Sequence, residues 1–253
     1  MKELKQIFAQ VVNNYGKDAA HSTAALKRFY YPIDASKAAE LLASEYKNTV
    51  EARGRLYLAD NETATRLQSI ANWLTNASCK PSLLLYGSLP GTGKTTTARA
   101  IARMARGLKA AFNAESIQEQ RCKDAGKWIP LENYERDYLS MCENSIIVPV
   151  FYTAMELANM VESSKATFEA LKRTQFLIID DLGTEPVSVK VFGNEYAPII
   201  ELLQHRYAEM LPTIITTNLG LNQIAATYGP RISDRLREMC EMLNYAQGES
   251  YRR

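Results

Sequence analysis

The chain has 253 residues, which is enough for one domain of good size or for one domain with a small appendage. Its 46% hydrophobic and 23% charged residues are typical of a globular protein and exclude a wholly disordered chain or a fibre. Thirty Lys and Arg residues against 28 Asp and Glu residues leave a net charge of +2, so any basic surface for nucleic acid must be local.

The cysteines and the apolar segments indicate the compartment. The 4 cysteines form no CxxC pair and the chain holds only 2 histidines, so neither a zinc site nor a disulfide scaffold is expected. The N-terminal segment lacks the continuous apolar stretch of a secretory signal, and no apolar run approaches the roughly 20 residues that span a bilayer. We therefore expect a cytoplasmic protein with no membrane partner.

The N-terminal part of the chain is predicted to be helical. Apolar residues recur at helical spacing from Leu4 to Val12. Asp34 or Ser36 is expected to cap a second helix that runs through Tyr46, and Asp60 to cap a third.

After residue 80 the pattern changes to short apolar runs that alternate with helical segments. Strands are expected at 82–86, 146–152, 176–179, 213–217 and 242–247, and helices at 95–104, 155–172, 197–210 and 232–239. This alternation predicts an α/β fold with a parallel sheet. Residues 107–145 are polar and look irregular, so we interpret them as an insertion. We divide the chain into a helical N-terminal region, 1–57, and an α/β domain, 58–253.

The strongest chemical signal is the glycine-rich segment at 87–95, GSLPGTGKT, between an expected strand and an expected helix. Its backbone N–H groups and the helix N-terminus favour phosphate, and the lysine and threonine that end the segment supply a cation for ATP and a hydroxyl for Mg²⁺. Ser88 takes the place of the usual first glycine, with Gly87 just before it. The expected nucleotide-binding residues are Ser88, Leu89, Pro90, Gly91, Thr92, Gly93, Lys94, Thr95 and Thr96. The alternative is a strand-to-helix turn that binds no ligand.

A second signal is the buried strand at 176–179, which ends in Asp180 and Asp181. Burying a carboxylate is costly unless it finds a cation or donors, and ligands bind at the carboxyl ends of parallel strands. We expect Asp180, together with Thr95, to hold Mg²⁺, and Asp181 to orient the attacking water. Taken alone, such a pair is more often a helix cap, but the phosphate loop upstream favours the metal site.

A third signal is the strand at 213–217, which ends at Asn218. The Asn218 amide is suited to a hydrogen bond with the γ-phosphate or with the lytic water. The alternative is an ordinary asparagine turn.

With these three motifs in order, the chain resembles the AAA+ ATPases and, more narrowly, the DnaC/DnaI-type helicase loaders and the IstB-like transposition ATPases. The segments that carry the resemblance are LIIDDLG at 177–183, RY at 206–207 with PTIITTNL at 212–219, ISDRL at 232–236 and GESYR at 248–252. The resemblance covers residues 60–253, approximately.

The resemblance implies a five-stranded parallel sheet, in which the strands numbered in chain order lie as 5-1-4-3-2, with helices on both faces. It also implies a homo-oligomer that forms on ATP binding, in which Arg235 acts on the nucleotide of a neighbouring subunit. Arg231 and Arg237 are rival candidates for that role, and Arg252 is a candidate for a second sensor. From the residues alone, the arginines at 231–237 would be interpreted as a solvated helix face.

Two groups of basic residues are candidate contacts for DNA phosphates. They are Arg99, Arg103 and Arg106 in one group, and Lys165, Lys172 and Arg173 in the other. Both groups also fit solvated helix faces. The aromatic residues Phe29, Tyr30 and Tyr31 are interpreted either as part of a helical core or as an exposed patch for a partner.

The sequence thus predicts an ATPase that loads a replicative helicase on single-stranded DNA, with residues 1–57 as the partner-binding part. One alternative is an IstB-like accessory ATPase that engages a transposase and double-stranded DNA. Another is a P-loop kinase acting on a small molecule, which the Asp-Asp-Leu-Gly and Thr-Thr-Asn segments disfavour.

Overall fold

A computed structural model of the chain describes residues 29–77, 79–124, 146–191 and 193–245. The helix expected from Leu4 to Val12 lies outside these described residues, as do the segment at 248–252 and its Arg252.

The centre of the molecule is a parallel five-stranded sheet with the order β2-β3-β6-β1-β7. Its strands are β1 (Ser82–Tyr86), β2 (Val150–Thr153), β3 (Leu177–Leu182), β6 (Thr213–Thr217) and β7 (Cys240–Asn244). Leu84 in β1 pairs with Ile215 in β6 on one side and with Met242 in β7 on the other. Numbered in chain order, the strands lie as 5-1-4-3-2, so the predicted fold class and strand order are confirmed.

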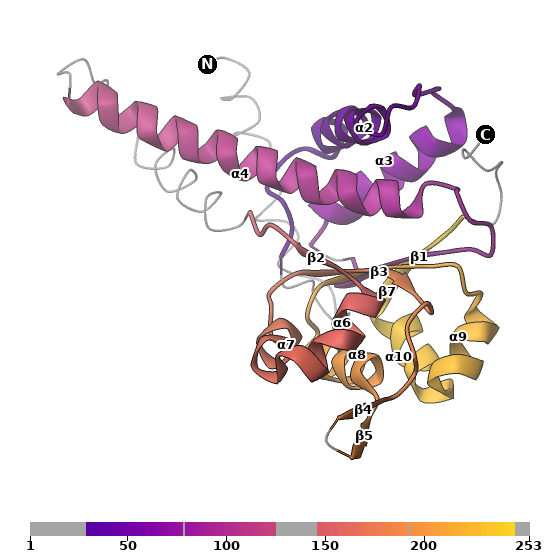
Figure 1. Cartoon of the computed structure of the whole chain (residues 1–253). Helices are drawn as coiled ribbons and strands as arrows, with labels where there is room; N and C mark the ends of the chain where they lie inside the picture. The colour runs from indigo at the N-terminus through magenta and orange to yellow at the C-terminus, as the bar shows by residue number, and fades with distance from the viewer. Residues whose placement is uncertain (1–28, 78, 125–145, 192, 246–253) are drawn as a thin grey trace, which may run out of the picture.

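Helices cover both faces of the sheet (Figure 1). One face carries α2 (Ala35–Glu51), α3 (Asn61–Thr75) and α4 (Lys94–Asp124), and the other carries α6 (Ala154–Ser163), α7 (Lys165–Lys172), α8 (Pro198–Ala208), α9 (Leu221–Tyr228) and α10 (Pro230–Met239). Alternate strand residues serve the two cores: Leu83 and Leu85 pack beneath α3 and α4, whereas Leu84 packs on the opposite side. This double burial explains why neighbouring residues inside the central strands, 83–85, 177–179 and 214–215, are all apolar.

The N-terminal helices are part of the same core. Asp34 caps α2, accepting from the Ser36 N–H at 2.7 Å, and Asp60 caps α3, accepting from the Thr63 N–H at 2.7 Å. α2 packs against both α3 and α4. Both expected caps are therefore confirmed, Asp34 being the one of the two candidates that caps α2.

Two of the three aromatic residues at 29–31 are buried. The Phe29 ring lies 4.7 Å from the Phe176 ring, and the Tyr31 hydroxyl donates to the Ile147 carbonyl at 2.9 Å. Both side chains pack in the core between the sheet and α2–α4. The exposed partner patch is therefore wrong for Phe29 and Tyr31, and the helical-core interpretation is correct.

Several boundaries differ from the expected ones. α4 continues to Asp124, so residues 107–124 are helical and not irregular, because they contain no proline and many good helix formers. The antiparallel hairpin of β4 (Val189–Val191) and β5 (Asn194–Tyr196) and the helix α9 were not predicted. These elements are too short for a periodic signal. Within the described part of the chain, no helix combines the length and hydropathy needed to cross a bilayer.

Candidate nucleotide-binding site

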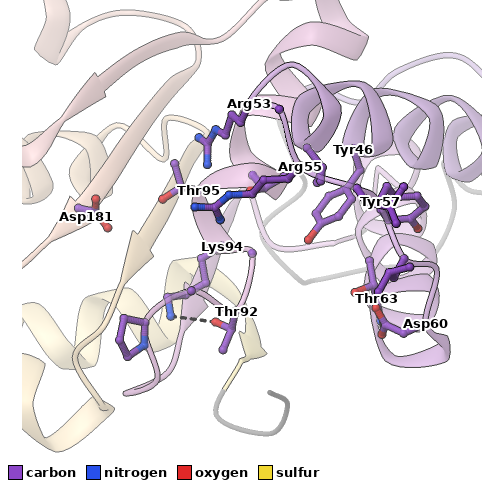
Figure 2. A pocket seen from close by; sticks show the side chains of 18 of the residues that line it. Tyr46, Arg53, Arg55, Tyr57, Asp60, Thr63, Thr92, Lys94, Thr95 and Asp181 are labelled. Atoms are coloured by element: carbon purple, nitrogen blue, oxygen red, sulfur yellow. Dashed lines mark hydrogen bonds between the residues drawn. The ribbon is translucent and has the colours of Figure 1, made fainter. Parts of the chain in front are cut away.

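The carboxyl ends of the central strands open into a pocket of about 690 Å³. The predicted phosphate loop and helix start contribute Pro90 to Thr96, and the other central strands contribute Asp181 and Asn218 (Figure 2). The opposite wall consists of Tyr46, Val50, Arg53, Gly54, Arg55, Leu56, Tyr57, Leu58, Asp60 and Thr63, from α2, α3 and the segment between them. The pocket lining thus comes from both sides of the predicted boundary at residue 57.

Lys94 occupies the centre of the loop. Its ammonium donates to the carbonyls of Gly87 and Leu89, both at 3.0 Å, and to the Thr92 hydroxyl at 3.3 Å. The side chain is only 5% exposed. Gly93 has a φ of 95°, and a Cβ there would collide with the Tyr46 hydroxyl of α2, so this position requires glycine. The loop therefore fixes one cation at the wall of the pocket.

The first two predicted loop residues lie outside the pocket lining. Ser88 and Leu89 are exposed at the surface, and Gly87, with a φ of 152°, makes the turn out of β1. The serine that replaces the usual glycine is thus accommodated without a special backbone conformation of its own. The predicted residues from Pro90 to Thr96 do line the pocket.

Asp180 lies just behind the loop and accepts two hydroxyl hydrogen bonds, from Thr95 at 2.9 Å and from Thr216 at 2.6 Å. It is 1% exposed, and this burial raises the pKa of its carboxyl, against the hydrogen bond from Thr216, which lowers it. Asp180 and Thr95 together offer the hard oxygen ligands that Mg²⁺ prefers. The donor set therefore fits the predicted metal site.

Asp181 and Asn218 both line the pocket, as the sequence led us to expect. Asp181 has a φ of 55°, which is uncommon for a residue other than glycine, and its N–H donates to the Thr216 hydroxyl at 2.9 Å. The same hydroxyl donates to Asp180, so Thr216 positions both acidic residues. Sequence analysis assigned no role to Thr216, which is one of three threonines on the buried strand β6.

Arg235 does not line the pocket. Its guanidinium lies 4.8 Å from the centre of the Tyr207 ring, and the Tyr207 hydroxyl donates to Glu238 at 2.5 Å. The rival arginines Arg231 and Arg237 are exposed on the same helix, α10. An action of Arg235 on a nucleotide thus requires the pocket of another molecule.

The basic groups considered for DNA are partly engaged within the protein. Arg103 pairs with Glu45 at 2.7 Å, and Arg99 lies 5.6 Å from the Phe151 ring centre. In the second group, Lys172 is 7% exposed and pairs with Glu169 at 3.0 Å and with Glu201 at 2.5 Å. Lys165 lies 5.2 Å from the Tyr196 ring centre. Of the six basic residues, all of which the structure describes, only Arg106 and Arg173 are exposed and form no such ion pair or ring contact.

The buried charge of Asp180 leads to a testable trade-off between stability and metal binding. Because burial raises the pKa of Asp180, the native state loses stability as the pH rises from the ordinary pKa of a carboxyl to this raised pKa, and no further above it. Asp180→Asn keeps an oxygen that accepts from Thr95 and Thr216, so we expect its Tm without Mg²⁺ to rise by a few degrees at neutral pH. This difference in Tm between Asp180→Asn and the wild type should vanish in acid, where the wild-type carboxyl is protonated.

Thermal unfolding from about pH 4 to pH 8 measures this effect, and Asp234→Asn, at an exposed position, is the control. A lower Tm for Asp180→Asn at neutral pH would contradict the assigned cost of the buried charge. Mg²⁺-dependent nucleotide affinity should fall in the same variant.

Comparisons with known proteins agree with this site. Residues 148–253 match the model of the IstB-like ATP binding protein family. No curated protein gave a match.

Three solved structures are similar at 19–20% identity. The DnaC helicase loader has 20% identity and a TM-score of 0.49, covering 79% of this chain and 97% of that one. DnaI has 19% identity and a TM-score of 0.47, covering 78% and 88%. A protein from Streptococcus pyogenes serotype M3, described as a primosome component, has 20% identity and a TM-score of 0.41, covering 88% of each chain.

The range that the family model matches includes part of the pocket lining. The matched residues include Asp180, Asp181 and Asn218, whereas the phosphate loop at 87–95 lies outside the matched range and follows β1, the neighbour of β6 in the sheet. ATP binding, as in the name of the matched family, agrees with a pocket built around a phosphate loop. The match at 148–253 confirms the motif resemblance to the IstB-like ATP binding proteins over those residues.

Proposed function

We propose that the pocket binds Mg·ATP and hydrolyses it to ADP and phosphate. The observation that carries the proposal is one cavity in which Lys94, Thr95, Asp181 and Asn218 converge, with Asp180 hydrogen-bonded to Thr95 behind it. A cation, a pair of hard oxygen ligands and a carboxylate free to face water are the groups that in-line attack on a γ-phosphate needs.

In this proposal each residue has a separate task. Lys94 contacts the β- and γ-phosphates, and Thr95 and Asp180 hold Mg²⁺. Bound Mg²⁺ neutralises the charge that develops on the phosphate oxygens. Asp181 orients the attacking water, Asn218 hydrogen-bonds the γ-phosphate or that water, and Thr216 holds the two acidic residues in place.

Asp181→Asn should keep ATP bound and slow hydrolysis by roughly 10²–10⁴-fold, since it removes the group that orients water but not the phosphate contacts. Nucleotide titration and steady-state phosphate release measure the two effects separately. If Asp181→Asn abolishes binding while Asp180→Asn leaves it intact, the two acidic residues have the opposite roles.

Arg235→Ala should bind ATP normally and hydrolyse it poorly, because we assign its action to the nucleotide of a neighbour in a homo-oligomer. Mixing it with Lys94→Ala should restore part of the activity, since one complete interface then forms from two defective subunits. The same mixture with Arg231→Ala or Arg237→Ala tests the rivals. If the hydrolysis rate per subunit of the wild-type protein does not change with protein concentration, an action in trans is contradicted.

For the biological role we propose a cytoplasmic DNA-transaction ATPase that loads a replicative helicase on single-stranded DNA. The motif resemblance to the helicase loaders supports this role. The family match at 148–253 favours a second candidate, an accessory ATPase that engages a transposase on double-stranded DNA.

ATPase activity and DNA affinity with matched single- and double-stranded oligonucleotides separate the two roles. A preference for single strands, with binding to the purified helicase of the same genome, supports the loader. A preference for double strands, with binding to the transposase, supports the second candidate.

The partner-binding role of residues 1–57 is tested by removing residues 1–28. This deletion retains α2 together with α3 and α4, against which it packs, whereas a cut near Arg53 would remove α2 from the core. Loss of partner binding with unchanged ATP hydrolysis supports the role. Unchanged partner binding counts against it for residues 1–28.

A further inference from the structure

The chain turns sharply after α2, at the sequence Arg53-Gly54-Arg55. The Arg53 N–H donates to the Val50 carbonyl at 3.1 Å, and the Gly54 N–H donates to the Glu51 carbonyl at 2.9 Å. Gly54 has a φ of 68°, which ends the helix and redirects the backbone between the two arginines. The turn therefore sets two adjacent guanidinium groups at one place on the pocket wall.

Both arginines line the nucleotide pocket, opposite the phosphate loop. Figure 2 shows the two side chains extending from the α2–α3 segment toward Thr95 and Lys94. Both residues are exposed at the wall of the pocket. Among the described residues, Arg55 forms no ion pair.

Cationic side chains outnumber carboxylates in the lining of the pocket near the phosphate loop. Lys94, Arg53 and Arg55 line the pocket, and the lining carboxylates are Asp181 and Asp60. Asp60 caps α3 through the Thr63 N–H and lies beside Tyr57, away from the loop (Figure 2). The excess of cations at one end therefore suits a strongly anionic group placed between the loop and the turn.

We propose that Arg53 and Arg55 form a phosphate clamp that contacts the terminal phosphates of a nucleotide bound in the same subunit. The proposal rests on the proposed ATP binding and extends it, since it assigns two residues of the N-terminal region to the site. The planar guanidinium donates two parallel hydrogen bonds to phosphate, which a lysine does not. The clamp acts within one subunit, unlike Arg235, which acts on a neighbour.

Nucleotide affinity tests the contact. Each single alanine variant of Arg53 or Arg55 should weaken binding of a non-hydrolysable ATP analogue by about 10-fold, and that of ADP by less. The double variant should therefore lose most of its preference for the triphosphate, and Arg→Lys variants should recover part of it. Lys47→Ala, at an exposed position on α2 outside the pocket lining, is the matched control.

The outcomes separate this inference from the proposed function. If Lys94→Ala loses ATP binding while the double arginine variant keeps the wild-type preference for triphosphate, the clamp is wrong and the ATP site stands. If the wild type binds no ATP, both fail. Thermal unfolding should show the arginine variants as stable as the wild type, because both side chains are exposed.

Subunit mixing tests whether the clamp acts within one subunit. Mixing the double arginine variant with Lys94→Ala should not restore ATP hydrolysis, because every subunit that binds ATP then lacks its own clamp. Recovery to the level of an Arg235→Ala and Lys94→Ala mixture would show an action in trans and would overturn the assignment.

Discussion

Lys94→Ala is expected to weaken ATP binding by about 100-fold, the largest effect on ligand binding that we predict. The ammonium is the cation fixed inside the phosphate loop by the Gly87 and Leu89 carbonyls. Its removal leaves phosphate oxygens facing backbone N–H groups without the charge that pairs with them. Titration with ATP and ADP, followed by calorimetry or by a fluorescent analogue, measures the loss.

Two controls make the result specific. Lys190→Ala, at an exposed position on the β4–β5 hairpin, should bind ATP like the wild type. The thermal unfolding of Lys94→Ala shows whether the loop stays folded without the bonds of the ammonium. Wild-type affinity in a folded Lys94→Ala protein would contradict the assignment of the phosphate loop.

Arg206→Met is expected to lower the free energy of unfolding by about 3–5 kcal/mol, the largest effect on stability. Arg206 is 0% exposed, and its guanidinium donates to the Thr213 hydroxyl at 2.7 Å, the Thr174 carbonyl at 2.9 Å and the Pro212 carbonyl at 2.6 Å. Burial lowers its pKa to about 9, so it stays protonated at neutral pH. Methionine fills the space but leaves these acceptors unpaired.

Denaturant unfolding of the two proteins measures the difference. The free energy of unfolding of Arg206→Lys should lie between those of the wild type and Arg206→Met, because lysine keeps the charge but lacks the planar set of donors. Arg231→Ala, at an exposed position on α10, should stay within about 0.5 kcal/mol of the wild type. A loss below about 1 kcal/mol in Arg206→Met would mean that water satisfies the acceptors instead.

The three inner strands β1, β3 and β6 could be predicted because each is a buried segment with an apolar interior next to a glycine turn or a polar end. The strand at 213–217 was located to the residue for this reason. The length of α4 was missed because its second half is polar in sequence and carries no clear apolar period. α9 and the β4–β5 hairpin are too short to show a period.

Some residues of the candidate site could be predicted from local sequence, and others could not. A phosphate loop and a strand ending in acidic residues are contiguous motifs, so Lys94 and Asp181 were found directly. Arg53 and Arg55 reach the pocket only because α2 packs against α3 and α4, and no local pattern encodes that packing. Thr216 acts through two hydrogen bonds across neighbouring strands, which only the strand register reveals.

Phosphate release from Mg·ATP into water, with no other acceptor present, tests the central claim most directly. We predict steady release by the wild type, at a rate per subunit that rises with protein concentration, and release reduced by roughly 10²–10⁴-fold in Asp181→Asn at saturating ATP. No release at any protein concentration, alone or with DNA, would contradict it, as would equal release by the two proteins. Phosphoryl transfer to an added small molecule in place of water would indicate a kinase.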